Sequence, residues 1–164
     1  MHLEQTLRYP AGPEAVAALL ADRSFVEDLC AAGEAEAWDV TVTGSPEGAF
    51  TVTTTRTLPT TALPDGVRRF LGATLQVRQV DAWGAPAARG ERTGTTALEI
   101  VGVPVTATAD LSLVAEATGT RQVVTGELRA AVPLVGARVE RAAEPVLVAA
   151  LREQEELAAR RLGG

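Results

Sequence analysis

The chain has no lysine, one cysteine and one histidine, and these shortages exclude several kinds of site. A single cysteine, Cys30, cannot form an internal disulfide and fits a reducing compartment. With His2 as the sole histidine, neither a Cys/His zinc site nor a Ser-His-Asp triad can be assembled. No glycine-rich phosphate loop of the required spacing follows a predicted strand. We therefore expect no metal, no cofactor and no catalytic residue.

Long apolar runs are missing as well. Residues 1–6 lack the basic and apolar regions of a signal peptide. No apolar run approaches the roughly 18 residues that span a membrane. The sequence therefore predicts a cytoplasmic protein without a transmembrane segment.

Aromatic residues and a basic face are also scarce. Aromatics make up 4% of the chain although hydrophobic residues make up 46%, so the core is built from Ala, Val and Leu. Such small side chains leave room for an internal cavity without proving one. The net charge is −6 and the arginines are scattered, which disfavours binding to nucleic acid. At 164 residues the chain fits one domain, residues 1–164.

What the chain does have is a long amphipathic stretch at its C-terminal end, residues 133–162. Apolar residues recur there every three or four positions and charged residues fill the opposite face, the pattern of a helix about 40 Å long. Pro133 suits a helix start and Gly163 a helix end. Pro145 should cost ~3 kcal/mol in a straight helix and is expected to bend this one. We expect Leu147 and Leu151 to be buried against a sheet.

The rest of the chain alternates as strands do. A strand over residues 2–9 precedes two short helices, 14–21 and about 24–33. Six further strands are predicted at residues 36–43, 50–57, 75–83, 92–101, 103–114 and 120–132. The segment 58–71 between them, with a short helix at 65–71, could be either a lid or a plug of the core.

This order of elements is similar to the helix-grip fold of the START-like superfamily, also called polyketide-cyclase-like or SRPBCC. The resemblance implies an α+β fold in which a curved seven-stranded antiparallel sheet grips a long C-terminal helix around a hydrophobic cavity. Within the superfamily, the chain resembles a bacterial family of unknown function, which supplies no catalytic residue to transfer. The segments that carry this narrower resemblance are residues 56–60, 63–64, 69–72, 83–84 and 132–136.

The period of the strands predicts which side chains line such a cavity. Arg56, inward among apolar walls, could anchor a carboxylate or carbonyl of a ligand. Alternatively it lies near its strand end and reaches solvent or an acid such as Glu127. The predicted ligand-binding residues are Tyr9, Val52, Arg56, Val77, Gln79, Ile100, Ala107, Ala109, Val124, Leu128, Ala143 and Leu147.

These patterns leave three functions to distinguish. The first is binding of a small hydrophobic molecule, lipid-like or polyketide-like, between the sheet and the terminal helix. The second is a cyclase or dehydratase that uses Arg56, Tyr9 or Glu127, weakened by the lack of a second histidine. The third is a protein-interaction module with a filled core. A homodimer is left open by the sequence.

Overall fold

The alternating stretches form one antiparallel sheet of seven strands in the order β1-β7-β6-β5-β4-β3-β2. The computed structural model describes residues 1–163. The strands are β1 (His2–Tyr9), β2 (Ala37–Gly44), β3 (Phe50–Pro59), β4 (Thr74–Trp83), β5 (Arg92–Ile100), β6 (Val105–Glu116) and β7 (Gly119–Ala130). The helices are α1 (Pro13–Leu20), α2 (Arg23–Ala32), α3 (Asp65–Leu71) and α4 (Gly136–Gly163), with a single 3₁₀ turn at Ala88–Gly90. Every predicted strand and helix is therefore confirmed, with boundaries displaced by a few residues.

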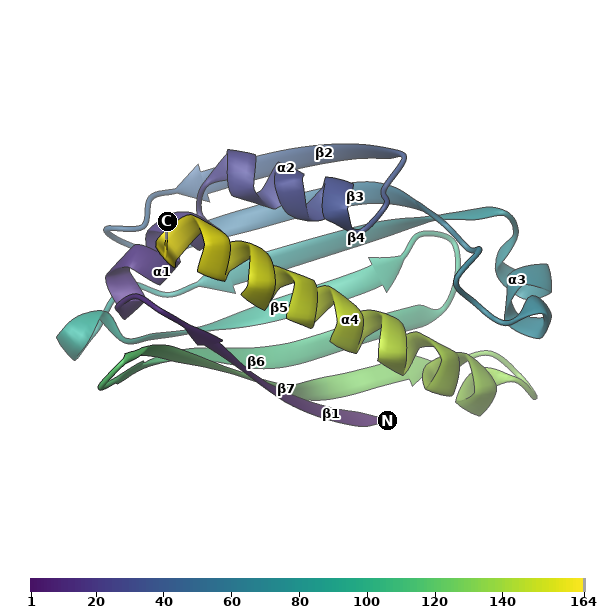
Figure 1. Cartoon of the computed structure of the whole chain (residues 1–164). Coiled ribbons are helices and arrows are strands. Elements are labelled where there is room, and N and C mark those ends of the chain that lie inside the picture. Colours follow the sequence, from purple (N-terminus) through teal and green to yellow (C-terminus); the bar gives the residue numbers. More distant parts are fainter. Residues whose placement is uncertain (164) are drawn as a thin grey trace.

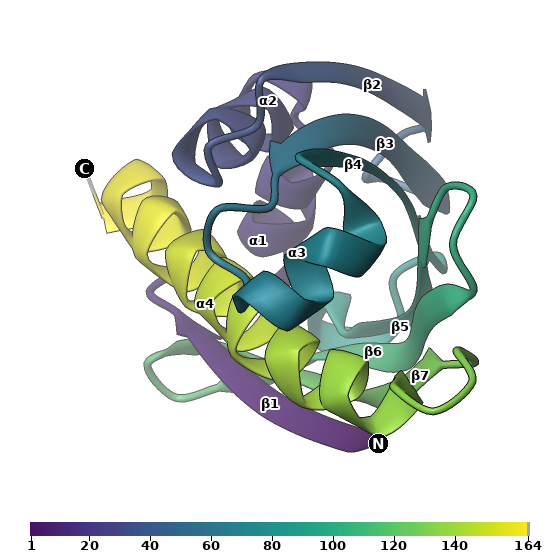
Figure 2. The ribbon, with the colours of Figure 1, turned by 90° about the vertical axis from the view of Figure 1, so that its right-hand side faces the viewer.

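The sheet is strongly curved, and the helices lie on its concave side (Figure 1). Viewed from the end at which α3 lies, the strands curl around α1, α2 and α4 (Figure 2). The C-terminal helix α4 packs along β1 and β7, and α2 packs on β2. This is the START-like helix-grip fold that the order of elements predicts. Among the described residues, no helix is both long enough and apolar enough to cross a membrane.

The helix α4 begins three residues later than predicted. Residues 133–135 form a turn in which Leu134 has a φ of 69° and is fully exposed. Gly136 then starts the helix, where a Cβ atom would come within 2.4 Å of the Ala130 carbonyl oxygen. The helix continues through Pro145 to its C-terminal end.

The apolar core is divided into two parts, which we call the first and second core. The first core is formed by α1, α2, the last turns of α4 and the strands beneath them, and includes Leu7, Val16, Phe25, Trp83 and Leu113. The second core lies around the start of α4 and includes Val105, Leu128, Ala130, Val132 and Val139. The concave face between the two cores is the part of the fold that positions the candidate site.

The helix α4 is anchored in both cores and is less buried between them. Val139 in the second core and Ala158 in the first core are its fully buried residues. Leu147 and Leu151, predicted to be buried, pack against the cores but remain partly exposed. In the middle of the sheet, the small residues Ala109 and Gly126 are paired across β6 and β7.

The segment between β3 and β4 lies at one end of the concave face, with α3 in front of the interior (Figure 2). Val67 is the buried residue of α3, whereas Phe70 is exposed. The Thr60 hydroxyl contacts the carbonyl oxygens of Gly72 and Ala73 at 2.5 and 3.1 Å, which ties the two ends of the segment together. These contacts fit a lid as well as a plug.

Candidate functional site

The concave face between the two cores carries a group of polar side chains, Arg56, Gln79, Asp81 and Thr96, which we call the inner polar cluster. They come from three neighbouring strands, β3, β4 and β5. The strand alternation puts Arg56 on the same face as buried Val52, and Gln79 and Asp81 on the same face as buried Val77. The β-ladder pairs Asp81 directly with Thr96. None of these four residues belongs to either core.

Hydrogen bonds connect the four side chains in one chain. Arg56 donates through Nη2 to Oε1 of Gln79 over 3.1 Å. Gln79 donates through Nε2 to both carboxylate oxygens of Asp81, at 3.0 and 3.1 Å. The Thr96 hydroxyl donates to Oδ1 of Asp81. Gln79 thus lies between the guanidinium and the carboxylate, and it orients both.

The surroundings disfavour the charged forms of this cluster. Burial raises the pKa of Asp81, and the hydrogen bonds from Thr96 and Gln79 and the charge of Arg56 oppose that rise. Burial likewise lowers the pKa of Arg56, against the effects of Cys30 and Asp81. The Cys30 thiol on α2 has its pKa raised by burial and lowered by the charge of Arg56. Cys30 is a buried residue of α2, the helix that packs on β2.

Apolar residues flank the cluster on the sheet and on α4. They are only partly buried although they lie on the concave face of the sheet or on the helix that packs over it. In a filled core such side chains would be fully enclosed. All but Leu98 pack against one of the two cores, yet part of each side chain stays accessible to solvent. The residues are Leu98, Ile100, Ala107, Ala109, Ala143 and Leu147.

The structure brings Arg56 and Gln79, each predicted to face inward, into direct contact. Ile100, Ala107 and Ala109 also lie on the concave face beside the cluster, as does Val77, which is itself buried. By contrast, three predicted residues are packed into the cores and expose little surface to a ligand. These are Val52, Val124 and Leu128.

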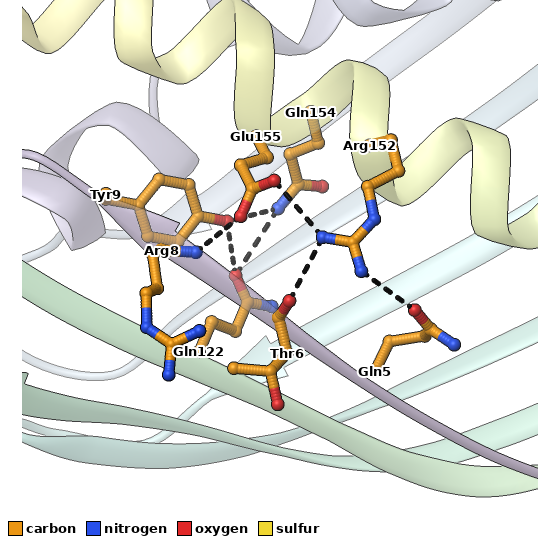
Figure 3. A network of polar contacts seen from close by, with 8 residues as sticks. All are labelled: Gln5, Thr6, Arg8, Tyr9, Gln122, Arg152, Gln154 and Glu155. Carbon is orange, nitrogen blue, oxygen red and sulfur yellow. Dashed lines mark hydrogen bonds and ion pairs between the residues drawn. The ribbon is translucent and has the colours of Figure 1, made fainter.

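Tyr9 faces inward but belongs to a different polar network, drawn in Figure 3. Its hydroxyl donates to Oε1 of Gln122 over 2.5 Å and accepts from Nε2 of Gln154 over 2.9 Å. Beside it, Arg152 of α4 donates to the Thr6 carbonyl and to the Gln5 side chain. This network connects α4 to β1 and β7. The Tyr9 hydroxyl, with both of its roles occupied, holds the helix in place.

Glu127 lies on the convex face, and its predicted roles inside the cavity are wrong. It is paired with the exposed Nδ1 of His2 at 2.9 Å and is 3.7 Å from the N-terminal ammonium group. Alternation along β7 points Glu127 away from the interior, because its neighbour Leu128 is buried in the second core. It can therefore neither pair with Arg56 nor act on a molecule held by the concave face.

Asp81 and Thr96 were not among the predicted site residues. The period of two already pointed to Asp81, which is the next inward position after Gln79 on the same strand. Thr96 is likewise two residues before the inward Leu98. Its position opposite Asp81 is known only from the register between β4 and β5. Within residues 1–163, no three His, Cys, Asp or Glu side chains gather closely enough to hold a metal ion.

Two hollows on the surface lie away from these residues. One, of about 430 Å³, is on the convex face around Thr95, Asp110 and Thr125. The other lies between the start of α1 and the turn from β6 to β7. Neither is lined by a predicted ligand-binding residue, so the enclosed cavity between sheet and α4 stays a prediction.

Solved structures with the same fold cover nearly the whole chain. TTHA0849 from Thermus thermophilus has a TM-score of 0.64 at 13% identity, over 99% of this chain and 97% of that one. Ms6760 from Mycobacterium smegmatis has a TM-score of 0.53 at 14% identity, over 99% and 90%. A STAR-related lipid transfer protein from Xanthomonas axonopodis has a TM-score of 0.55 at 13% identity, over 93% and 85%. At these identities the likeness establishes the fold alone.

The search of curated proteins finds no match to this chain. A family model does match, and it covers residues 4–162. That match includes all seven strands but for the first two residues of β1, and nearly all of α4. The chain therefore belongs to DUF2505, a family of proteins of unknown function.

Proposed function

We propose that this protein binds a small, largely apolar molecule between the concave face of the sheet and α4. The observation that carries the proposal is the group of inward apolar side chains between the two cores that stay partly exposed. Each Å² of apolar surface left in contact with water forgoes about 25 cal/mol of stabilisation. A ligand that covers these side chains recovers that free energy.

The sheet and α4 supply the apolar walls of the proposed site, and the inner polar cluster supplies its polar end. The sheet supplies Leu98, Ile100, Ala107 and Ala109, while Leu147 extends from the middle of α4, where the helix is least buried. The inner polar cluster lies at the β3–β4 side and gives the site one polar end. A mainly apolar surface with a few convergent polar groups is typical of sites for small molecules.

The fold supports the same function by analogy. One protein with this fold carries the name of a STAR-related lipid transfer protein. Because a fold alone does not determine function, the argument depends on the side chains between the cores.

Titration with the neutral apolar dye N-phenyl-1-naphthylamine tests the proposal. We expect a saturable rise of dye fluorescence with one site per chain. Ala109→Trp fills the centre of the concave face and should abolish the rise. Thr108→Trp is the matched control, because Thr108 is the adjacent residue of β6 and is exposed on the convex face.

Circular dichroism and the midpoint of urea unfolding show whether each variant is folded. If the wild-type protein takes up no dye, or if Ala109→Trp and Thr108→Trp take it up equally, the proposed site is wrong. In the first of these cases, the interaction module with a filled core replaces the binding protein.

A further inference from the structure

We propose that the ligand is a monocarboxylate with an apolar chain, whose carboxylate binds the guanidinium of Arg56. This inference rests on the proposed function and adds the chemistry of the ligand's polar end. Three observations support it: Arg56 has unused hydrogen-bond donors, Gln79 holds its guanidinium in place, and a single positive charge neutralises a single carboxylate.

Arg56 has more donors than the protein uses. A guanidinium carries five N–H donors in a planar fork. Among residues 1–163, the hydrogen-bond partner of the Arg56 side chain is Oε1 of Gln79, and no carboxylate lies within 4.0 Å. A partly buried cation without a direct counter-ion is costly, and a bound anion would relieve that cost.

Some exposed arginines of the same protein have acidic partners. Arg161 contacts Asp28 and Asp22, and Arg152 contacts Glu155. These pairs lie at the surface, where water alone would solvate the charge. The inward Arg56 is the less solvated group and still lacks such a pair.

The acid nearest in the interior does not serve as this partner. Both oxygens of Asp81 accept from Nε2 of Gln79, and one also accepts from the Thr96 hydroxyl. Gln79 separates the carboxylate from the guanidinium and turns its own oxygen toward Arg56. The fork is therefore oriented before a ligand arrives, which lowers the entropic cost of binding.

The charge of the cluster favours a monoanion over a dianion. One guanidinium matches one carboxylate in a bidentate pair. A phosphate monoester carries a charge of about −1.5 to −2 near neutral pH, which the single guanidinium of Arg56 does not balance. The apolar chain of a monocarboxylate would then extend from Arg56 over Val77 and Ile100, which lie in the same row of the sheet.

Isothermal titration calorimetry with three probes of equal chain length tests the inference. The probes are dodecanoate, dodecan-1-ol and dodecyl phosphate, at neutral pH. We expect the wild-type protein to bind dodecanoate at least about tenfold more tightly than either other probe, since hydrogen bonds to charged groups are worth 10- to 100-fold in affinity, roughly.

Variants of two arginines identify the group responsible. Arg56→Gln should weaken dodecanoate binding by about 10- to 100-fold and change dodecan-1-ol binding by less than about twofold. Arg56→Lys should recover part of the loss. Arg78→Gln is the matched control, because Arg78 is exposed on the other face of β4.

The outcomes separate this inference from the proposed function. Equal binding of dodecanoate and dodecan-1-ol by the wild-type protein overturns the inference, and this comparison needs no variant to fold. Tighter binding of dodecyl phosphate, or an Arg56→Gln protein that binds dodecanoate normally, also overturns it. If neutral dye does not bind either, the proposed function itself has failed.

Discussion

At the scale of single residues, the inner polar cluster is the part of the molecule that stability alone does not explain. Gln79 and Asp81 face the interior but belong to neither of the two apolar cores. The sheet holds a carboxyl group whose pKa is raised by burial. A group of this kind in the interior is a candidate for function.

Asp81→Asn should change how stability depends on pH. Because burial raises the pKa of Asp81 in the folded chain, its contribution to stability is largest below the ordinary carboxyl pKa of roughly 4 and is lost as pH rises through the raised value. Asparagine does not ionise. The free energy of unfolding of Asp81→Asn relative to wild type should therefore increase from about pH 4 to about pH 7.

Urea unfolding at a series of pH values measures this difference, with the exposed Asp110→Asn as control. A difference between Asp81→Asn and wild type that stays constant with pH would show that Asp81 is well solvated, and a difference that falls with pH would show that its partners stabilise the carboxylate. Either result would contradict the prediction.

Tyr9 gives a second residue-scale prediction, because it is the sole tyrosine of the chain. Burial raises the pKa of its hydroxyl, and the bond from Gln154 opposes that rise. Tyrosinate absorbance should therefore not appear at the ordinary tyrosine pKa of roughly 10. It should appear at higher pH together with the loss of the far-UV circular dichroism signal. Ionisation near pH 10 (roughly the ordinary value) with the fold intact would contradict the network of Figure 3.

At the scale of elements, α4 shows how far the sequence predicts the structure. Its periodicity predicted which face meets the sheet, and that face does contact both cores. Periodicity does not reveal which residues of the sheet lie opposite each turn of the helix. Leu147 and Leu151 were therefore expected to be more deeply buried than they are. The sequence did not predict the helix start at Gly136. The turn over residues 133–135 depends on a left-handed backbone conformation at Leu134, which leucine rarely adopts.

Replacements along α4 should reflect this uneven packing. Val139→Ala removes two methyl groups from the second core and should cost about 2 kcal/mol. Leu147→Ala removes a larger group but should cost less, since Leu147 is already partly exposed. Urea unfolding of the two variants measures the order. A larger loss for Leu147→Ala would mean that the middle of α4 is pressed onto the sheet.

The sequence predicted part of the candidate site, because periodicity shows which face a residue lies on but not which residue it meets. Alternation along β3 and β4 placed Arg56 and Gln79 on the concave face, and their hydrogen bond confirms that they meet. Pairing between strands, which alternation does not determine, brought Thr96 to Asp81. Tyr9 has the predicted direction, but its partner Gln154 comes from α4, whose position over β1 could not be read from spacing.

At the scale of the whole molecule, the two cores hold α4 at its two ends. Between the two cores, the side chains of the sheet are polar or small. We propose that a ligand binds in this stretch of the interior. Its location, more than the affinity of any one probe, is the central claim.

Methyl NMR spectra recorded during titration with N-phenyl-1-naphthylamine test that location most directly. We predict that the methyl signals of Leu98, Ala107 and Leu147, which line the interior, shift and saturate together. The signal of Ala97, the exposed neighbour of Leu98 on the convex face, should stay in place. Shifts confined to Val123 and the convex hollow, with Ala107 and Leu147 unchanged, would contradict the account.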